Sequence, residues 1–322
     1  MRKKIPAKVK AKKKLSPLKK RVSLFACLLL VGLFIAGQFI AEERKPVVET
    51  EKNAMKKIPS DVRRVMSATA IAPTIRVPIL MYHYVENIAD KKDKMRVLLN
   101  VTPAVFEEQL KTLKDAGYTF LTARELGEIL DGKAQLPQKP ILLTFDDGHW
   151  DFDTDVLPLL KKYNIKATAY IIPGFTGGSD FMTQAQVEDV VQSGLIDVGA
   201  HTVHHIALKG RLFSTVQDEV AGSKKMLEDT YHIHVVSFAY PNGSFDQQAI
   251  TIVKAAGFET AVSTIPGEDV NQTNRFFIYR LRPGYRVGND LLTYLITNPW
   301  TAKTKDLGTI PSTNTNKTKP NS

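Results

Sequence analysis

Residues 141–148 read ILLTFDDG, a short run of apolar, strand-forming side chains that ends abruptly in two carboxylates and a glycine. Polar residues end three further apolar runs in the same way, at His83, His201 and Tyr240. Helix signals lie between such runs. The pattern therefore predicts parallel strands joined by helices.

The predicted strands are continuously apolar, which indicates a sheet covered on both faces. About seven such strands in one region favour an α/β fold, a barrel of the TIM type, with a doubly wound open sheet as the alternative. The predicted strands are Val77–Tyr82, Ile141–Phe145, Ala167–Ile172, Ile196–Ala200, Val235–Ala239, Thr260–Ser263 and Phe276–Leu281. The predicted helices are Thr102–Gly117, Gln184–Gly194, Ser214–Thr230 and Asp246–Gly257.

The positive charge of the chain is concentrated at its N-terminus. The 322 residues include 44 Lys and Arg against 33 Asp and Glu, a formal net charge of +11. Eleven of the basic residues lie in residues 1–21, and residues 1–41 hold no acidic residue, so residues 42–322 are balanced. A nucleic-acid-binding domain carries a basic footprint of its own. The sequence therefore predicts no nucleic-acid partner.

An uncharged apolar span follows the basic segment. Residues 22–41 read VSLFACLLLVGLFIAGQFIA, long enough to cross a hydrocarbon core of about 30 Å as a helix. Positive charge before the span places the N-terminus inside. A cleaved signal peptide is the alternative, but Phe39-Ile40-Ala41 is a poor cleavage site. Cys27 in this span is the one cysteine of the chain, so no internal disulfide and no cysteine metal site are expected.

These features predict five segments along the chain. The tail holds too few apolar residues to bury a core and is expected to be disordered. The predicted location is the cell membrane, with one span and the folded region outside the cytoplasm. The segments are a basic cytoplasmic segment (1–21), a transmembrane signal anchor (22–41), a charged stalk (42–75), an α/β domain (76–300) and a polar tail (301–322).

The polar residues at the strand ends form the candidate site. The C-terminal ends of parallel strands in an α/β barrel meet at one face, where active sites lie. That face would gather His83, Asp146, Asp147, His201 and His205. Two histidines at i and i+4 can reach one ion, and one Asp with two His leaves a divalent metal open positions for water and substrate. These ligands suit zinc, and also cobalt or nickel.

Each of these residues also has an ordinary structural interpretation. Asp-Asp-Gly alone is commonly a turn, and a lone histidine is commonly a packed core residue. Their coincidence on separate strand ends makes the metal site the stronger hypothesis. His204 stays open as a substitute ligand for His205, and His149, His232 and His234 are interpreted as structural or surface residues.

The motifs resemble those of the NodB-homology polysaccharide deacetylases, carbohydrate esterase family 4. The resemblance rests on Thr144-Phe145-Asp146-Asp147-Gly148 followed by His201-Thr202-x-x-His205, and it covers roughly residues 76–290. Leu80-Met81-Tyr82-His83 and Phe238-Ala239-Tyr240-Pro241-x-Gly243 look like the branch that deacetylates poly-β-1,6-N-acetylglucosamine in biofilm matrix. The resemblance implies a distorted (β/α) barrel of about seven strands.

The resemblance also implies roles for single residues. Asp146, the first carboxylate of the motif, would be the catalytic base. Asp147, His201 and His205 would hold the metal. In the biofilm branch the acid comes from the first strand, which implies that His83 protonates the leaving amine.

One departure from the family pattern affects the base. Many relatives that act on peptidoglycan or chitin have Arg-x-Pro-Tyr where residues 239–242 of this chain read AYPN, and that arginine orients the catalytic Asp. The arginine is therefore missing at its usual position. Arg280 or Arg282 in the last predicted strand is expected to replace it.

The predicted function is metal-dependent removal of N-acetyl groups from an extracellular N-acetylglucosamine polysaccharide, poly-N-acetylglucosamine in particular. Tyr240 and Pro241 are predicted to bind the substrate, with the Tyr240 N–H at the oxyanion, and Trp150 is a further candidate for sugar stacking. Two alternatives stay open. One is deacetylation of peptidoglycan, and the other is an inactive glycan-binding module on the same fold.

Overall fold

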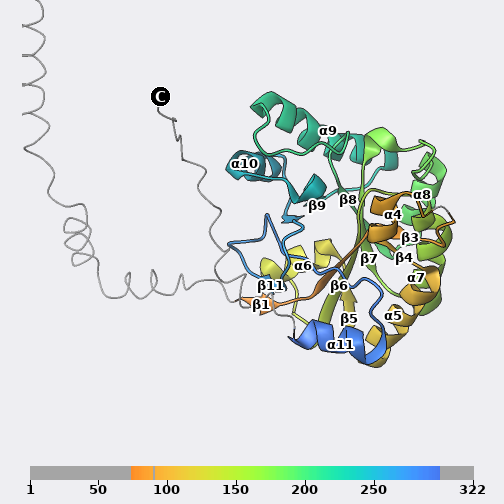
Figure 1. Cartoon of the computed structure of the whole chain (residues 1–322). Helices are drawn as coiled ribbons and strands as arrows, with labels where there is room; N and C mark the ends of the chain where they lie inside the picture. The colour runs from red at the N-terminus through yellow and green to blue at the C-terminus, as the bar shows by residue number, and fades with distance from the viewer. Residues whose placement is uncertain (1–73, 90, 298–322) are drawn as a thin grey trace, which may run out of the picture. The chain divides into compact units, whose positions relative to one another are not determined.

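The structure is a computed structural model that describes residues 74–89 and 91–297 (Figure 1). The predicted basic segment, the apolar span with Cys27, the stalk up to residue 73 and the tail 301–322 lie outside these residues. Within the described ranges, no helix is both long and apolar enough to cross a membrane.

A parallel sheet of seven strands forms the centre of the described region. Its strands are β2 (Ile79–Tyr82), β5 (Thr119–Leu121), β6 (Pro140–Phe145), β7 (Ala167–Ile171), β8 (Ile196–Ala200), β9 (Ser237–Ala239) and β10 (Thr260–Val262). Six strands follow the order β10-β9-β8-β7-β6-β2, and β5 pairs with β6. Six of the predicted strands are thus confirmed to within two residues at either end, while β5 has no predicted counterpart. The alternating α/β pattern and the parallel pairing are also confirmed.

The prediction of a strand at Phe276–Leu281 is wrong, because this segment makes only isolated bridges. Ile278 bridges to β10 and Leu281 bridges to β2, both in parallel orientation. Between them, the Arg280 N–H donates to the carbonyl of Ile265, so the segment never pairs with one strand at consecutive positions. An apolar run in a sequence does not distinguish single bridges from a ladder. The segment still connects the two edge strands, which curls the sheet into the TIM-like shape expected.

Helices lie around the strands, as Figure 1 shows for α5, α7, α8 and α9. Two short paired sheets flank the main sheet: β1 (Ile75–Arg76) with β11 (Asp269–Val270), and β3 (Tyr84–Val85) with β4 (Asn100–Val101). Short irregular turns are η1 (Phe152–Val156), η2 (Pro173–Phe175) and η3 (Pro241–Gly243). The helices are α4 (Lys94–Leu99), α5 (Pro103–Asp115), α6 (Ala123–Leu130), α7 (Leu157–Tyr163), α8 (Gln184–Gln192), α9 (Phe213–Tyr231), α10 (Gln247–Ala255) and α11 (Gly288–Thr297).

The helices begin where the sequence supplies caps. The Thr102 side chain accepts a hydrogen bond from the backbone of the first turn of α5, whose first residue is Pro103. Thr183 and Gln186 form a reciprocal capping box at the start of α8. The Asp246 side chain accepts a hydrogen bond from the backbone N–H of Ala249 at the start of α10. The four predicted helices are therefore confirmed within a few residues.

Alternate residues of the strands pack on opposite faces of the sheet, because successive side chains of a strand point in opposite directions. Leu142 and Ile278 belong to one buried cluster, and Leu143 belongs to the other. Continuing the alternation by two residues puts Thr144 and then Asp146 on the face of Leu142. The same step from Ile278 puts Arg280 on that face.

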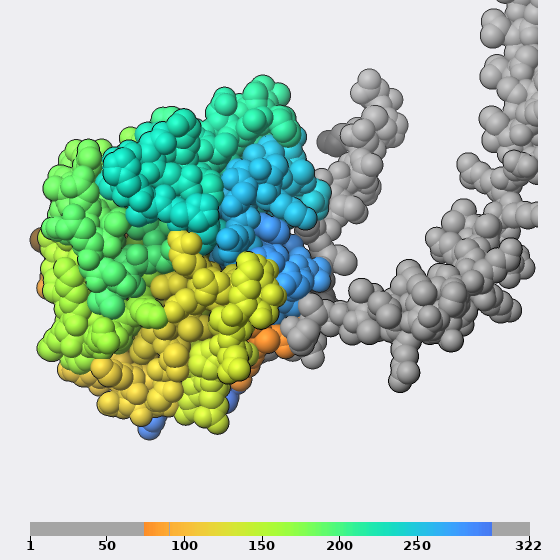
Figure 2. Space-filling view, turned by 180° about the vertical axis from the view of Figure 1, so that it is seen from behind, coloured from red at the N-terminus to blue at the C-terminus, as the bar shows by residue number. Residues whose placement is uncertain are grey.

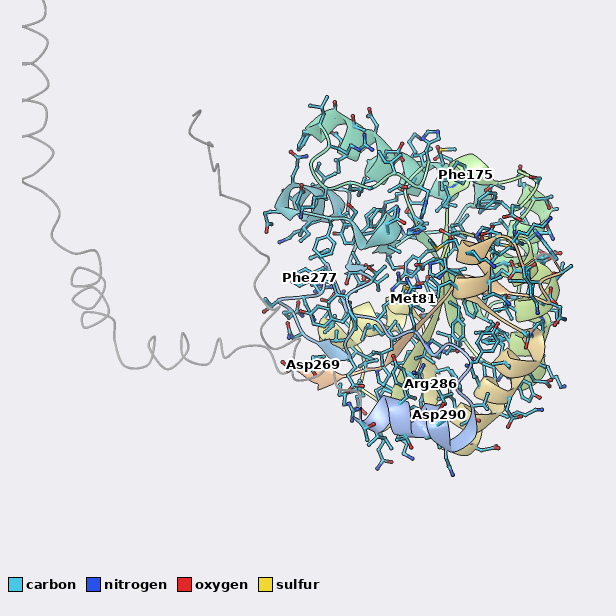
Figure 3. All side chains as sticks on the ribbon, in the orientation of Figure 1. Met81, Phe175, Asp269, Phe277, Arg286 and Asp290 are labelled. Carbon is cyan, nitrogen blue, oxygen red and sulfur yellow. The ribbon has the colours of Figure 1, made fainter. Side chains whose placement is uncertain are left out.

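The two ends of the strands face different surroundings. Figure 3 shows Phe175, which follows β7, far from Arg286 and from Asp290 of α11, which lie at the lower end of the view. Figure 2 shows the side turned away in Figure 1, where segments coloured from yellow to blue form the outer surface. The strand ends that carry the polar motifs lie toward the side of Phe175.

Candidate active site

The strand ends meet at a pocket of about 600 Å³, within the range of ligand-binding pockets. All five residues predicted to meet there do so, although they come from three strand ends. His83 follows β2, Asp146 and Asp147 follow β6, and the two histidines follow β8. The lining residues are His83, Tyr84, Met95, Leu98, Leu99, Asp146, Asp147, His149, Ile172, Phe175, Phe181, His201, His205, Asn242, Thr264 and Arg282.

Asp147, His201 and His205 point their ligand atoms at one another. Oδ1 of Asp147 lies 3.4 Å from Nε2 of His201 and 3.3 Å from Nε2 of His205. Candidate ligand atoms of the three residues all lie within 4.8 Å of one another. Two ligands of a tetrahedral ion at about 2.1 Å are about 3.4 Å apart, which matches these separations.

The hydrogen bonds around the three residues also fit a cation. Nδ1 of His201 lies 2.7 Å from the carbonyl oxygen of Ala239, which only accepts, so Nδ1 carries the hydrogen and Nε2 presents a lone pair. Oδ1 of Asp147 is buried and accepts no hydrogen bond. A buried carboxylate oxygen and two imidazole nitrogens thus face one another at the spacing of metal ligands. A divalent metal would resolve this arrangement, and the donor set suits zinc, cobalt or nickel.

The backbone around the pocket is held in an uncommon conformation. Positive φ angles occur at Asp147 (79°), Thr202 (63°), His205 (54°) and Asn242 (55°), all at strand ends beside the pocket. They are four of the six such non-glycine residues in the described part of the chain. Each such angle costs about 1–3 kcal/mol and persists only where the surroundings impose it. This clustering is typical of a functional site.

His204 is turned away from the group of ligands. Its side chain is 62% exposed, and its Nδ1 lies 2.8 Å from Oε1 of Glu219. The other carboxylate oxygen, Oε2, accepts from the backbone N–H groups of Val203 and His204. Glu219, on α9, thus fixes the loop after β8 so that His205, not His204, reaches Asp147. The structure does not bring His204 to the site as a substitute ligand.

Arg280 holds Asp146 in a bidentate ion pair. Nη1 and Nη2 each lie 2.7 Å from a different oxygen of the carboxylate, and both side chains are buried. The guanidinium also donates to the carbonyl of Ser263 and to Oγ1 of Thr144. Burial acts to raise the pKa of Asp146, but the Arg280 guanidinium outweighs it and holds the pKa below its usual value. Asp146 is therefore ionised at neutral pH. Of the two arginines predicted to replace the missing one, Arg280 is the one that orients Asp146.

His83 lies beside this pair. Its Nε2 is 3.9 Å from Oδ2 of Asp146, and it lines the pocket. Burial lowers the pKa of His83, and the carboxylates of Asp146 and Asp147 oppose that effect without cancelling it. His83 is thus positioned to exchange a proton inside the pocket.

The predicted substrate contacts of Tyr240 are wrong. Its ring has no exposed surface and its hydroxyl donates to the carbonyl of Phe276. Its N–H donates to the carbonyl of Val262 at 3.2 Å, so it is not free for an oxyanion. Pro241 is buried as well, and Asn242 is the residue of this segment that lines the pocket. The strand β9 ends at the pocket, but its last side chains point into the core.

Trp150 is half-buried and is not among the residues that line the pocket. Arg282 does line the pocket, from an exposed position two residues beyond Arg280. The prediction also overlooked His149, which is 4% exposed and lies on the pocket wall beside Asp147. Its position directly after Asp147-Gly148 is the one signal in the sequence that points to it.

Replacing Arg280 by Met should destabilise the protein by about 3–5 kcal/mol at pH 7, because the carboxylate of Asp146 then stays buried without its partner. Arg282→Met removes a guanidinium of the same kind from an exposed position and should change stability by about 0.5 kcal/mol or less. Urea unfolding of both variants and of the unmodified protein measures the difference.

The difference in unfolding free energy between the unmodified protein and Arg280→Met should change with pH in a definite direction. In the unmodified protein the pKa of Asp146 is lowered, so the stabilisation is present at neutral pH and is lost as pH falls through the lowered pKa. In Arg280→Met, burial raises the pKa of Asp146, so protonation relieves the buried charge as the pH falls from neutral. The stability gap should therefore narrow on acidification. Equal stabilities of the Arg280 and Arg282 variants at pH 7 would contradict the assignment.

Comparison with known proteins agrees with this geometry. Residues 133–261 match the model of the polysaccharide deacetylase family. The matched segment contains Asp146, Asp147, His201 and His205. It excludes His83 and Arg280, which the structure places beside Asp146.

Whole-chain comparisons extend the match. The chain is 28% identical over 267 residues to "Putative polysaccharide deacetylase YxkH" of Bacillus subtilis (strain 168), covering 80% of this chain and 92% of that protein. It is 26% identical over 210 residues to a poly-beta-1,6-N-acetyl-D-glucosamine N-deacetylase of Staphylococcus aureus, covering 61% of this chain and 71% of that protein. The solved structure of the Streptococcus pyogenes deacetylase PplD in complex with acetate superimposes with a TM-score of 0.64 at 28% identity, covering 69% of this chain and 99% of that one. The chain therefore carries a polysaccharide deacetylase domain of the NodB type, which places it among the hydrolases of carbohydrate esterase family 4.

Proposed function

We propose that this protein hydrolyses the N-acetyl groups of an extracellular N-acetylglucosamine polysaccharide, poly-N-acetylglucosamine in particular, with a divalent metal held by Asp147, His201 and His205. The observation that carries the proposal is the buried Oδ1 of Asp147, which faces two imidazole nitrogens and accepts no hydrogen bond. Beside it, Asp146 is kept ionised by Arg280. The substrate class is supported by the Staphylococcus aureus relative, whose name gives poly-beta-1,6-N-acetyl-D-glucosamine.

Each group in the site has a separate role in the proposed reaction. A bound divalent metal would supply Lewis-acid polarisation and a more acidic water. Asp146 accepts the proton of the attacking water, since its carboxylate is ionised and Arg280 fixes its direction. The bidentate contact keeps the carboxylate aimed at the pocket while the remaining lone pairs stay available.

His83 delivers the proton that the leaving nitrogen requires. An amine leaves only when it is protonated, whereas an activated ester releases a stable leaving group without a proton. The pKa of His83 is lowered by burial, which makes the protonated ring a stronger acid. Its Nε2 lies 3.9 Å from Oδ2 of Asp146, beyond hydrogen-bond distance but beside the base in the same pocket. His83 is thus proposed as the general acid.

The test of this function is acetate release from defined N-acetylglucosamine oligomers. The Zn²⁺-loaded protein should release acetate from β-1,6-linked oligomers, and His205→Ala should lose both bound Zn²⁺ and release. The neighbouring His204→Ala is the matched control and should keep most of both. Release from β-1,4-linked oligomers alone would overturn the linkage. Binding of oligomers without any acetate release would overturn the enzyme and favour a glycan-binding module.

The role of His83 has its own test. His83→Ala should keep the metal and lose about 10²–10⁴-fold in amide hydrolysis, the usual contribution of a general acid. Hydrolysis of an activated acetate ester by the same variant should fall much less. Rates of both reactions on the metal-loaded variant measure the ratio. A loss of equal size for amide and ester would remove His83 from the proton transfer to nitrogen.

We also propose that the protein is held in the cell membrane by residues 22–41, with the domain outside the cytoplasm. The support is the uncharged apolar span preceded by eleven basic residues. Cell fractionation should find the full-length chain in the membrane, with the domain open to external protease. A freely soluble form that begins near residue 42 would contradict this.

A further inference from the structure

His149 is held by ring stacking on both sides. Its ring lies 4.0 Å from the ring of Tyr84 and 4.9 Å from the ring of Phe181, each at an interplanar angle of 23°. The ring is almost fully buried, yet it lines the pocket next to the proposed metal ligands. An imidazole fixed in this way has one orientation.

Both ring nitrogens of His149 face oxygens that only accept hydrogen bonds, so both can donate only when each nitrogen carries a hydrogen. Nδ1 lies 3.1 Å from the carbonyl oxygen of Asp180. Nε2 lies 3.4 Å from Oδ2 of Asp147 and is buried without a hydrogen bond. That oxygen is the one turned away from His201 and His205, which face Oδ1. The two carboxylate oxygens of Asp147 therefore have separate neighbours.

The partners of His149 are fixed in turn by Arg96. Nη1 of Arg96 contacts both carboxylate oxygens of Asp180, at 2.7 and 3.0 Å, and Nε pairs with Glu86. The guanidinium also lies over the ring of Tyr84, 4.5 Å from its centre. Arg96 thus contacts both Asp180, whose carbonyl accepts from Nδ1 of His149, and Tyr84, whose ring stacks on His149.

From this geometry we propose that His149 is a positioning residue, which fixes the Asp147 carboxylate so that Oδ1 faces the metal. The inference rests on the metal site proposed above. Without a contact to Oδ2, the carboxylate is free to rotate about its last bond and would spend part of its time with neither oxygen aligned. Hydrogen bonds to ligating carboxylates orient them, and their loss commonly weakens metal binding by about 10–100-fold. The 3.4 Å separation is longer than a hydrogen bond and would shorten as the ligands close on the ion.

Two substitutions at His149 separate the contact from the packing. His149→Phe keeps an aromatic ring between Tyr84 and Phe181 but removes both nitrogens, and it should weaken Zn²⁺ binding by about 10–100-fold. His149→Gln retains an N–H that can reach Oδ2, so it should restore at least part of the affinity. His234→Gln changes an exposed histidine outside the pocket and serves as the control. Competition with a chelator measures the Zn²⁺ affinity, and the absorption spectrum of bound Co²⁺ reports the ligand geometry.

The outcomes are distinguishable from failure of the proposed function, because no substrate is used. Zn²⁺ affinity of His149→Phe within about twofold of the unmodified protein would overturn the proposal. Equal losses in the Phe and Gln variants, with unchanged thermal stability of the metal-free proteins, would overturn the contact to Oδ2 as the cause. If His149→Phe does not fold, the Gln variant and the Co²⁺ spectrum decide. Failure of the unmodified protein to bind Zn²⁺ would overturn the metal site and this proposal together, whereas metal binding without acetate release would overturn the deacetylase alone.

Discussion

The buried ion pair between Arg280 and Asp146 is the contact on which the rest of the site depends. It crosses the interior of the sheet, from the segment that closes the sheet to the end of β6. Two charges at 1% and 3% exposure are stable only when each satisfies the other and additional hydrogen bonds complete the guanidinium, as Ser263 and Thr144 do here. The pair therefore performs two tasks: it fastens residues 276–281 across the open edge of the sheet and keeps one carboxylate ionised at the pocket.

The neighbouring carboxylate serves a different purpose because the backbone changes direction between them. Asp146 directly follows β6 and continues its inner face, while Asp147 has a φ of 79° and turns toward the loop after β8. Adjacent residues thus deliver one carboxylate to an arginine and the other to two histidines. Backbone strain at four places around the pocket is the cost of this arrangement, and burial of the flanking strands imposes it.

The sequence was sufficient to predict the features that follow from the spacing of apolar residues, such as the strands and the edge at which they end. Parallel strands place their ends at one edge, so the meeting of His83, Asp146, Asp147, His201 and His205 was predictable from three apolar runs and the residues that follow them. The sequence did not predict which of the two candidate arginines pairs with Asp146. Alternation along the last segment places Arg280 on the inner face, whereas Arg282 lies past the end of the sheet. Phe276–Leu281 has strand composition but bridges two partners in turn, and composition does not report pairing.

Other errors concern the direction and surroundings of side chains. Tyr240 stands at a strand end beside the pocket, yet its ring fills the core, because a strand end fixes the position of a residue and not the side to which it points. His149 was placed among structural histidines because its partners come from distant segments. Tyr84, Phe181 and Asp180 carry no pattern that associates them with the motif. Contacts of this kind become visible only in three dimensions.

The central claim is that Asp146 and Asp147, neighbours in the chain, have separate roles as base and ligand. The most direct measurement is Zn²⁺ affinity together with acetate release for Asp146→Asn, with folding checked because Arg280 loses its charged partner. The account predicts that Zn²⁺ affinity stays within about threefold of the unmodified protein while acetate release falls by about 10²-fold or more. Loss of the metal along with the activity, or near-normal release, would contradict it.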